Sequence, residues 1–309
     1  MHALPVCLCI GASRGIGRQI AIDLARNGYT VVVSAKTTSD ASKCSPFPPN
    51  PNSPQSTINT VAREITEAGG TALAIAVDVR YAESIDELVA KLIDVYGRLD
   101  VVVYNSGAIW WSSVEHTPVK RYRLMQQVNS EGLYATIQAS LPHLYKNSVK
   151  GIGRIIVVSP PIYSRFFRGK TAYAMSKVAC SVLTQGLAMD FLREGRSDMA
   201  VTSIWPAAAI ESAATQHNSV DRSQLRRPTI FSDAILALLT TSASKVNGRC
   251  VLDEDFLRET GVTDFSRYVL IAGSEPRRIM PAVLPDLTVA EQDDEGDRMD
   301  SNESKFAKL

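Results

Sequence analysis

Short, mostly apolar runs recur along the chain and alternate with segments whose apolar residues follow a helical spacing. The runs lie at residues 6–10, 30–35, 72–77, 99–104, 152–159, 199–205 and 248–252, and the first of them is apolar throughout. Runs of this kind are typical of strands buried on both faces, as in parallel sheets whose crossovers are helices. The pattern therefore predicts an α/β fold: a single Rossmann-type doubly wound sheet of seven parallel strands with helices on both faces.

Two segments depart from this alternation. Residues 39–56 are rich in proline, serine and asparagine, which predicts a flexible surface insert rather than a helix or a central strand. From residue 286 onward acidic side chains outnumber basic ones and few apolar residues remain, so residues 286–309 are expected to form a disordered acidic tail. Residues 1–285 are then one domain.

The composition of the 309-residue chain changes this picture little. Hydrophobic residues make up 45% and charged residues 21%, and the net charge is +1, so nothing indicates a nucleic-acid or anionic-membrane partner. No apolar run reaches the length of a membrane span, and residues 1–10 lack the basic region of a secretory signal. Five scattered cysteines favour reduced thiols in an intracellular protein, without the spacing of a metal site.

A glycine-rich segment stands between the first predicted strand and the helix after it. It reads Gly11-Ala12-Ser13-Arg14-Gly15-Ile16-Gly17. Glycines in a strand-to-helix turn let the backbone approach a pyrophosphate, and the helix N-terminus supplies amides and a positive dipole. The segment predicts a dinucleotide site, with a tight turn of incidental glycines as the alternative.

Polar residues after the next strands indicate which dinucleotide binds. Lys36, and no acid, follows the second strand, where an acid would bind the ribose 2′-hydroxyl and repel a 2′-phosphate. Arg14 and Lys36 can both reach a 2′-phosphate, which favours NADP(H) over NAD(H), although Lys36 could also be a solvated cation. Asp78 and Asn105 follow the third and fourth strands at the same sheet edge, where Asp78 either accepts from the adenine amino group or begins a helix.

Tyr173 and Lys177 are four residues apart, a spacing that places both side chains on one face of a helix. A nearby ammonium favours the phenolate and lowers the pKa of a tyrosine. Such a pair can give a proton to a carbonyl oxygen, or take one from a hydroxyl, while a hydride moves at the adjacent carbon. The spacing is also common on helix surfaces.

Several motifs in register over residues 5–255 resemble the short-chain dehydrogenase/reductase family. They are the glycine segment, Asn105-Ser106-Gly107, Asn129, Ser159 and Tyr173-Ala174-Met175-Ser176-Lys177. The resemblance implies that Tyr173 is the acid/base and that Lys177 lowers its pKa and binds the nicotinamide ribose. It also implies that Asn129 holds a proton-relay water and that the protein is a homodimer or homotetramer.

Three positions depart from the family pattern. Ile10 replaces a threonine and Tyr104 replaces an asparagine. The substrate-orienting serine of the family lies thirteen residues before the tyrosine, where this chain has Pro160. Ser159 stands one residue earlier, where it either turns into the site in place of that serine or points away from it, and we include it among the candidate catalytic residues.

A narrower resemblance is to the peroxisomal hydroxysteroid dehydrogenase-like subgroup, whose members often carry a sterol-carrier domain after the dehydrogenase. It rests on Ser159-Pro160-Pro161, Ser34-Ala35-Lys36-Thr37 and Trp205-Pro206. The terminal Ala307-Lys308-Leu309 resembles the Ser-Lys-Leu address that the peroxisomal import receptor binds. We expect a peroxisomal location, with the cytoplasm as the alternative.

The sequence predicts an NADP(H)-dependent oxidoreductase that interconverts a small-molecule ketone or aldehyde and an alcohol. Aromatic and apolar residues predict an apolar, lipid-like or polyketide-like substrate: Trp110, Trp111, Ile162, Tyr163, Phe166, Phe167 and Trp205. One alternative is a nucleotide-binding sensor or scaffold with little or no turnover, which Pro160 favours. Another is a tailoring reductase of a biosynthetic pathway, which would use the same chemistry.

Overall fold

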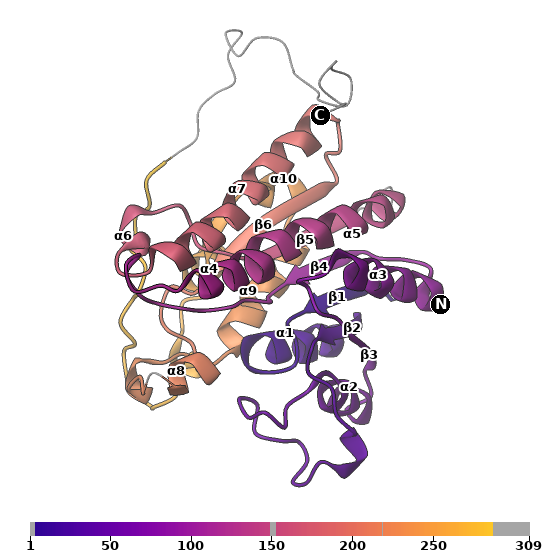
Figure 1. The fold of residues 1–309 in the computed structure, drawn as a ribbon, viewed down its shortest axis with the longest axis horizontal. Helices are drawn as coiled ribbons and strands as arrows, with labels where there is room; N and C mark the ends of the chain where they lie inside the picture. Colours follow the sequence, from indigo (N-terminus) through magenta and orange to yellow (C-terminus); the bar gives the residue numbers. More distant parts are fainter. Residues whose placement is uncertain (1–3, 149–152, 218, 287–309) are drawn as a thin grey trace.

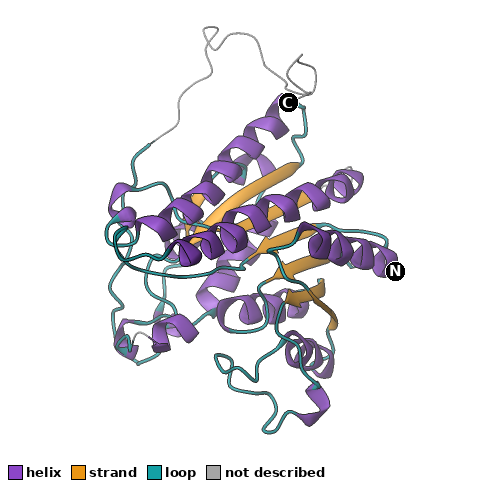
Figure 2. Ribbon diagram, in the orientation of Figure 1, coloured by secondary structure: helices purple, strands orange, loops and turns teal. Residues whose placement is uncertain are grey.

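The computed structural model describes residues 4–148, 153–217 and 219–286. Seven strands form one parallel sheet in the order β3-β2-β1-β4-β5-β6-β7 (Figures 1 and 2). They are β1 (Val6–Ile10), β2 (Thr30–Ala35), β3 (Thr71–Ala76), β4 (Val101–Tyr104), β5 (Gly153–Val158), β6 (Met199–Trp205) and β7 (Cys250–Leu252). The chain builds outward from β1 to β3 and then returns to place β4 on the other side of β1. The predicted doubly wound sheet is confirmed.

Helices cover both faces of the sheet. One layer contains α1 (Gly15–Arg26), α2 (Ile58–Glu67), α9 (Thr229–Thr240) and α11 (Asp253–Glu259). The other contains α3 (Ala82–Tyr96), α5 (Gly132–Ser148) and α7 (Thr171–Arg193), with α5 lying between its two neighbours (Figure 1). Shorter helices occupy the connections: α4 (Val119–Met125), α6 (Ser164–Phe167), α8 (Ala213–His217) and α10 (Ala243–Val246). Single 3₁₀ turns form at Ala41–Lys43, Arg222–Gln224 and Ser266–Tyr268. None of the helices in the described ranges is long and apolar enough to cross a membrane.

The two-sided burial of the strands explains the apolar runs. Successive side chains of a strand point to opposite faces. In β1, Cys7 and Cys9 pack beneath α1, whereas Leu8 and Ile10 pack on the α3 side, and all four are buried. Each face of β1 therefore requires apolar residues, and burying one large side chain of this kind contributes about 1.5–3 kcal/mol.

One predicted strand is longer than the observed one, because a buried residue next to a strand can serve to anchor it instead of belonging to it. The run predicted at 99–104 forms a strand only from Val101. Asp100, just before it, accepts the amide of Val6 at 2.7 Å and two hydrogen bonds from Arg98. This carboxylate fixes the start of β1 against the start of β4.

The proline-rich insert at residues 39–56 lies against the glycine-rich turn. The Pro51 carbonyl accepts the amide of Gly15 at 2.9 Å, and the Ser56 hydroxyl donates to the Ser13 carbonyl at 2.7 Å. These contacts place the insert beside the predicted dinucleotide site, while its flexibility stays a prediction. The predicted acidic tail, except Asp286, and the terminal tripeptide lie outside the described residues.

Residues 277–281, which we call the C-terminal strap, run beside the loop that follows β6. The Ala207 carbonyl accepts the amide of Ile279 at 2.7 Å, and Arg278 forms a two-pronged ion pair with Asp255 at 2.6 and 2.7 Å. Asp253 also fixes this loop, because its carboxylate accepts hydrogen bonds from the amides of Ala207 and Glu254 at 2.8 and 2.7 Å. Burial raises the pKa of Asp253 to about 7.

The raised pKa of Asp253 predicts a pH-dependent stability. The folded state retains a proton that an unfolded aspartate releases near pH ~3.9, so the free energy of unfolding falls as the pH rises from about 4 to about 7. Asp253→Asn keeps an oxygen acceptor for both amides and removes this loss. At pH about 8 we expect the variant to be more stable by roughly 1–3 kcal/mol, which is a few degrees in Tm.

Near pH about 4 the variant and the wild-type protein should have nearly the same Tm, because the loss of stability that deprotonation of unfolded Asp253 causes has then only begun. Calorimetric melting at both pH values measures this, and a difference that does not change with pH contradicts it.

Candidate active site

A cleft of about 680 Å³ opens at the carboxyl ends of the central strands. Its walls are the glycine-rich turn, the ends of β2 and β3, and residues 105–109 after β4. Eight of the predicted cofactor residues line it: Gly11, Ser13, Arg14, Gly15, Ile16, Lys36, Asp78 and Asn105. The residues that strand order predicts to be neighbours are therefore brought together.

The glycine-rich turn has no room for side chains. A Cβ on Gly17 would lie 2.1 Å from the Gly11 carbonyl oxygen, and one on Gly11 would lie 2.5 Å from the Ser106 amide nitrogen. Asn105 donates its side-chain amide to the same Gly11 carbonyl at 2.9 Å and so links the turn to β4. The turn exposes backbone at the N-terminus of α1, and this fits a pyrophosphate.

Cations surround the far end of the cleft. Lys36 lies 3.3 Å from the Asp78 carboxylate, and Arg80 donates to that carboxylate at 2.8 Å through Nε. The Arg80 guanidinium holds the pKa of Asp78 well below its usual range. Arg14 approaches from the glycine turn and donates to the Thr37 hydroxyl at 3.3 Å. Sequence reasoning missed Arg80, although a basic residue two positions after a strand-end acid is a usable signal. This donor set fits a dinucleotide of the NADP type better than one without a 2′-phosphate.

Tyr173 lies in the first turn of α7 and is 4% exposed. Its ring lies 6.3 Å from the ring of Trp111 and 6.1 Å from that of Phe166, and burial raises its pKa well above the usual value. Lys177, one turn later, is equally buried and donates to the Val158 carbonyl at 2.8 Å. Burial lowers the pKa of Lys177. The predicted pair therefore shares a largely dehydrated environment.

Asn129 belongs to a π-helical turn, Gln126–Glu131, that joins α4 to α5. Its side-chain oxygen accepts the Ala108 amide at 2.7 Å, and its nitrogen donates to the Ser176 hydroxyl at 2.8 Å. Tyr104, which stands where the family has an asparagine, donates its hydroxyl to the Val128 carbonyl at 2.6 Å and supports the turn. Wide turns of this kind are frequent at functional sites.

Gly107 marks the point where these groups meet. A Cβ at this glycine would lie 3.5 Å from Lys177 Nζ and 3.7 Å from Asn129 Oδ1. Gly107 also lines the cleft. The π-helical turn and α7 thus approach each other at Gly107, on the wall of the cleft.

Ser159 points elsewhere. It is fully buried, its hydroxyl lies 2.8 Å from that of Ser203, and it accepts a hydrogen bond from Ser181 at 3.1 Å. Ser203 in turn contacts Thr184 at 2.7 Å. These hydroxyls form a closed polar cluster between α7, β5 and β6. The geometry gives no support to a substrate-orienting role for Ser159.

Aromatic residues close the site above Tyr173. Phe166 packs edge-on against Trp205 at 5.6 Å, and the strap residue Met280 joins the same buried cluster. Trp110, Tyr163 and Phe167 pack at its periphery. Ile162 instead lines a separate hollow beside the later turns of α7. Met280 was missed by sequence reasoning because it belongs to a distant, irregular segment.

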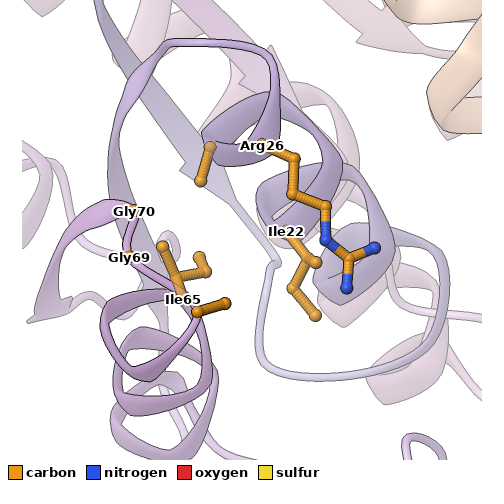
Figure 3. A pocket seen from close by; sticks show the side chains of 7 residues that line it. Ile22, Arg26, Ile65, Gly69 and Gly70 are labelled. Carbon is orange, nitrogen blue, oxygen red and sulfur yellow. The ribbon is translucent and has the colours of Figure 1, made fainter.

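Another hollow, of about 220 Å³, lies between α1 and α2 (Figure 3). Ile22, Ile65 and Gly70 line it, and its one ionic side chain, Arg26, pairs with Asp23 at 3.2 Å. It lies at the end of α1 away from the glycine-rich turn, and its lining offers no acid/base pair.

Comparison with known proteins agrees with this fold. Hydroxysteroid dehydrogenase-like protein 2 of Mus musculus is 35% identical over 288 residues, which cover 92% of this chain and 54% of the mouse protein. The chain thus spans about half the length of that relative. A short chain dehydrogenase structure from Mycobacterium thermoresistibile has a TM-score of 0.75 at 33% identity, covering 89% of this chain and 93% of its own.

A metagenomic short-chain oxidoreductase crystallised with NADP has a TM-score of 0.59 at 24% identity, covering 80% of this chain and 96% of its own, and supports the fold. Residues 52–222, more than half of the chain, match the family model of short chain dehydrogenases. With the sheet, the glycine-rich turn and the Tyr173–Lys177 pair in place, the chain belongs to the short-chain dehydrogenase family.

Proposed function

We propose that this protein is an NADP(H)-dependent oxidoreductase that interconverts a carbonyl and an alcohol on an apolar substrate, with Tyr173 as the acid/base. The observation that carries the proposal is the position of Lys177 and Asn129 beside Gly107, which lines the dinucleotide cleft, with Tyr173 one helical turn before Lys177. This position matters more than any pKa, because an acid/base group can transfer a proton only when it lies within hydrogen-bond reach of the reacting atoms.

The cofactor assignment rests on the cations at the far end of the cleft. Lys36 is largely exposed and shares the Asp78 carboxylate with Arg80, so Arg80 can keep that carboxylate paired when Lys36 turns to a 2′-phosphate. Arg14 donates to the uncharged Thr37 hydroxyl, which leaves its charge for the same phosphate. The metagenomic relative holds NADP, and one from Thermococcus sibiricus, 23% identical, holds 5-hydroxy-NADP. When bound, the nicotinamide supplies or accepts the hydride.

Tyr173 handles the proton in each direction. For reduction, its hydroxyl gives a proton to the carbonyl oxygen as the carbonyl carbon gains hydride, and a phenolate remains. Lys177 uses one of its three donor hydrogens on the Val158 carbonyl, so its charge and remaining donors can stabilise that phenolate. We assign Asn129 the support of the water that returns a proton to the pair.

The raised pKa of Tyr173 makes this residue better suited to carbonyl reduction, which consumes a proton, than to alcohol oxidation. Burial keeps the phenol protonated across the neutral range, so a proton donor is present for carbonyl reduction without any rearrangement. Alcohol oxidation requires the phenolate, which is the scarcer form.

A second candidate function is nucleotide binding with weak turnover. The buried Ser159 hydroxyl favours it, because the substrate oxygen then has Tyr173 but no serine beside it. Loss of one such donor typically costs about 10²–10³ in rate. A tailoring reductase of a biosynthetic pathway would use the same residues and differ only in substrate.

Location and assembly are further parts of the proposal. Ala307-Lys308-Leu309 would bind the peroxisomal import receptor and direct the protein to the peroxisome, with the cytoplasm as the alternative. Exposed apolar side chains on α7, Val182 and Leu192 among them, are consistent with a homodimer or homotetramer formed through this helix.

Tyr173→Phe removes the proposed proton donor and should lower kcat for carbonyl reduction by about 10²–10⁴. In the wild-type enzyme, reduction should be constant between pH about 6 and 8, while alcohol oxidation rises with pH because the phenolate becomes more abundant. NADPH consumption with a panel of ketones measures both. Turnover of the phenylalanine variant within a few-fold of wild type would remove Tyr173 from the reaction.

Lys36→Asp places an acid where the 2′-phosphate is proposed to bind. We expect the ratio of NADPH to NADH affinity to fall by about 10- to 100-fold, because a favourable ion pair becomes a repulsion. Lys43→Asp is the matched control, since Lys43 is an exposed cation of the insert that does not line the cleft. Fluorescence titration gives both ratios. An unchanged ratio in Lys36→Asp would move the phosphate site elsewhere.

Ser159→Ala tests whether this serine is structural. We expect the free energy of unfolding to fall by about 1–3 kcal/mol, because buried hydroxyls lose a partner, while kcat/KM changes by only a few-fold. Ser203→Ala should behave alike, because it opens the same cluster. A loss of about 10²–10³ in kcat with normal stability would show instead that Ser159 turns toward the substrate.

A further inference from the structure

Lys170 lies immediately before α7, three residues ahead of Tyr173. Its ammonium is 4.3 Å from the centre of the Phe166 ring and 5.7 Å from that of Trp111. These are the same two rings that pack against Tyr173. A positive charge is therefore held one aromatic side chain away from the proposed acid/base.

No carboxylate of the described residues lies within ion-pair distance of Lys170, although the side chain is half-buried. Burial without a counter-ion lowers the pKa of its ammonium. Aromatic faces attract a cation but do not neutralise it. An anion at this position would restore the charge balance that burial disturbs.

A hollow of about 260 Å³ adjoins Lys170. Apolar side chains make up part of its lining: Tyr163, Phe166, Ile279, Met280 and Pro281. Arg165 and Arg278 contribute the other charges. Arg278 is already paired with Asp255, so the unpaired cations of the hollow are Lys170 and the exposed Arg165.

We infer that this hollow binds an anionic oxygen group, a carboxylate or a phosphate, carried by the same apolar molecule whose carbonyl reacts at Tyr173, and that Lys170 contacts it. The inference rests on the proposed function and narrows its substrate class from apolar carbonyl compounds to amphipathic oxo-acids or oxo-alcohol phosphates. The Phe166 and Trp111 rings lie within 6.3 Å of the Tyr173 ring and within 5.7 Å of the Lys170 ammonium. Apolar surface therefore separates the two ends, which suits a hydrocarbon chain joining a carbonyl to an anionic group.

Matched ligand pairs test the inference without requiring turnover. Oxo-acids of increasing chain length, each with its methyl ester, are titrated calorimetrically into the full-length protein in the presence of NADP⁺. At the chain length that fits, we expect the acid to bind about 10- to 100-fold more tightly than its ester, as for a charge-assisted hydrogen bond. An oxo-alcohol phosphate and its free alcohol form a second pair, and the tighter-binding anion identifies the group.

Variants at the lysine give the decisive comparison. Lys170→Met, which keeps the length but loses the charge, should reduce the acid-to-ester ratio to about one, whereas Lys170→Arg should retain most of it. Arg168→Met removes an exposed cation that does not line the hollow and should leave the ratio unchanged.

Equal binding of acid and ester at every chain length, or a ratio that persists in Lys170→Met, overturns the inference. Failure of the proposed function gives a different result, because a bound oxo-acid would then cause no NADPH consumption while the affinity ratio stays intact.

Discussion

The Lys177 ammonium is buried, and among the residues that the structure describes it donates to one acceptor, the Val158 carbonyl, at 2.8 Å. A buried cation without a carboxylate partner is costly, and proteins usually pair it or neutralise it. Here the cation lies one helical turn from Tyr173 and 5.7 Å from the ring of Trp205. In the proposed reaction, this charge would stabilise the phenolate formed at Tyr173, so the group whose burial costs stability would assist proton transfer.

The hydrogen bond between Lys177 and the Val158 carbonyl is accompanied by a sharp turn at the end of β5. Val158 gives its carbonyl to Lys177, and the next amide, that of Ser159, turns back to the Val157 carbonyl at 3.0 Å. Such a tight turn is common at strand ends. Pro160 has no amide to continue the strand, and its carbonyl accepts from Ser181 at 2.6 Å. The proline thus replaces the family serine and also fixes a backbone path that sends the preceding hydroxyl into the core.

The sheet could be predicted from the sequence because its cause is local: a strand buried on both faces needs apolar residues on both of its faces, as in β1. The glycine-rich turn was predictable for a similar reason, since only glycine fits the close approach at Gly17. The direction of Ser159 was not, because it depends on Ser181 and Ser203, which lie far along the chain. Met280 likewise reaches the site through strap contacts that leave no periodic pattern.

The two rings over Tyr173 are not equally fixed. Phe166 is 6% exposed and packs against Trp205, whereas Trp111 is 50% exposed and comes from an irregular stretch between β4 and α4. Moving Trp111 exposes less buried apolar surface than moving Phe166 would, and therefore costs less free energy. A substrate of the proposed reaction would accordingly reach Tyr173 more easily from the Trp111 side. Lys170 contacts both rings, and a displaced Trp111 leaves its ammonium with one aromatic partner fewer. An anionic substrate that supplies the missing partner would offset part of the cost of displacing Trp111, and recognition of its charge would then be coupled to its access to Tyr173, the proposed acid/base.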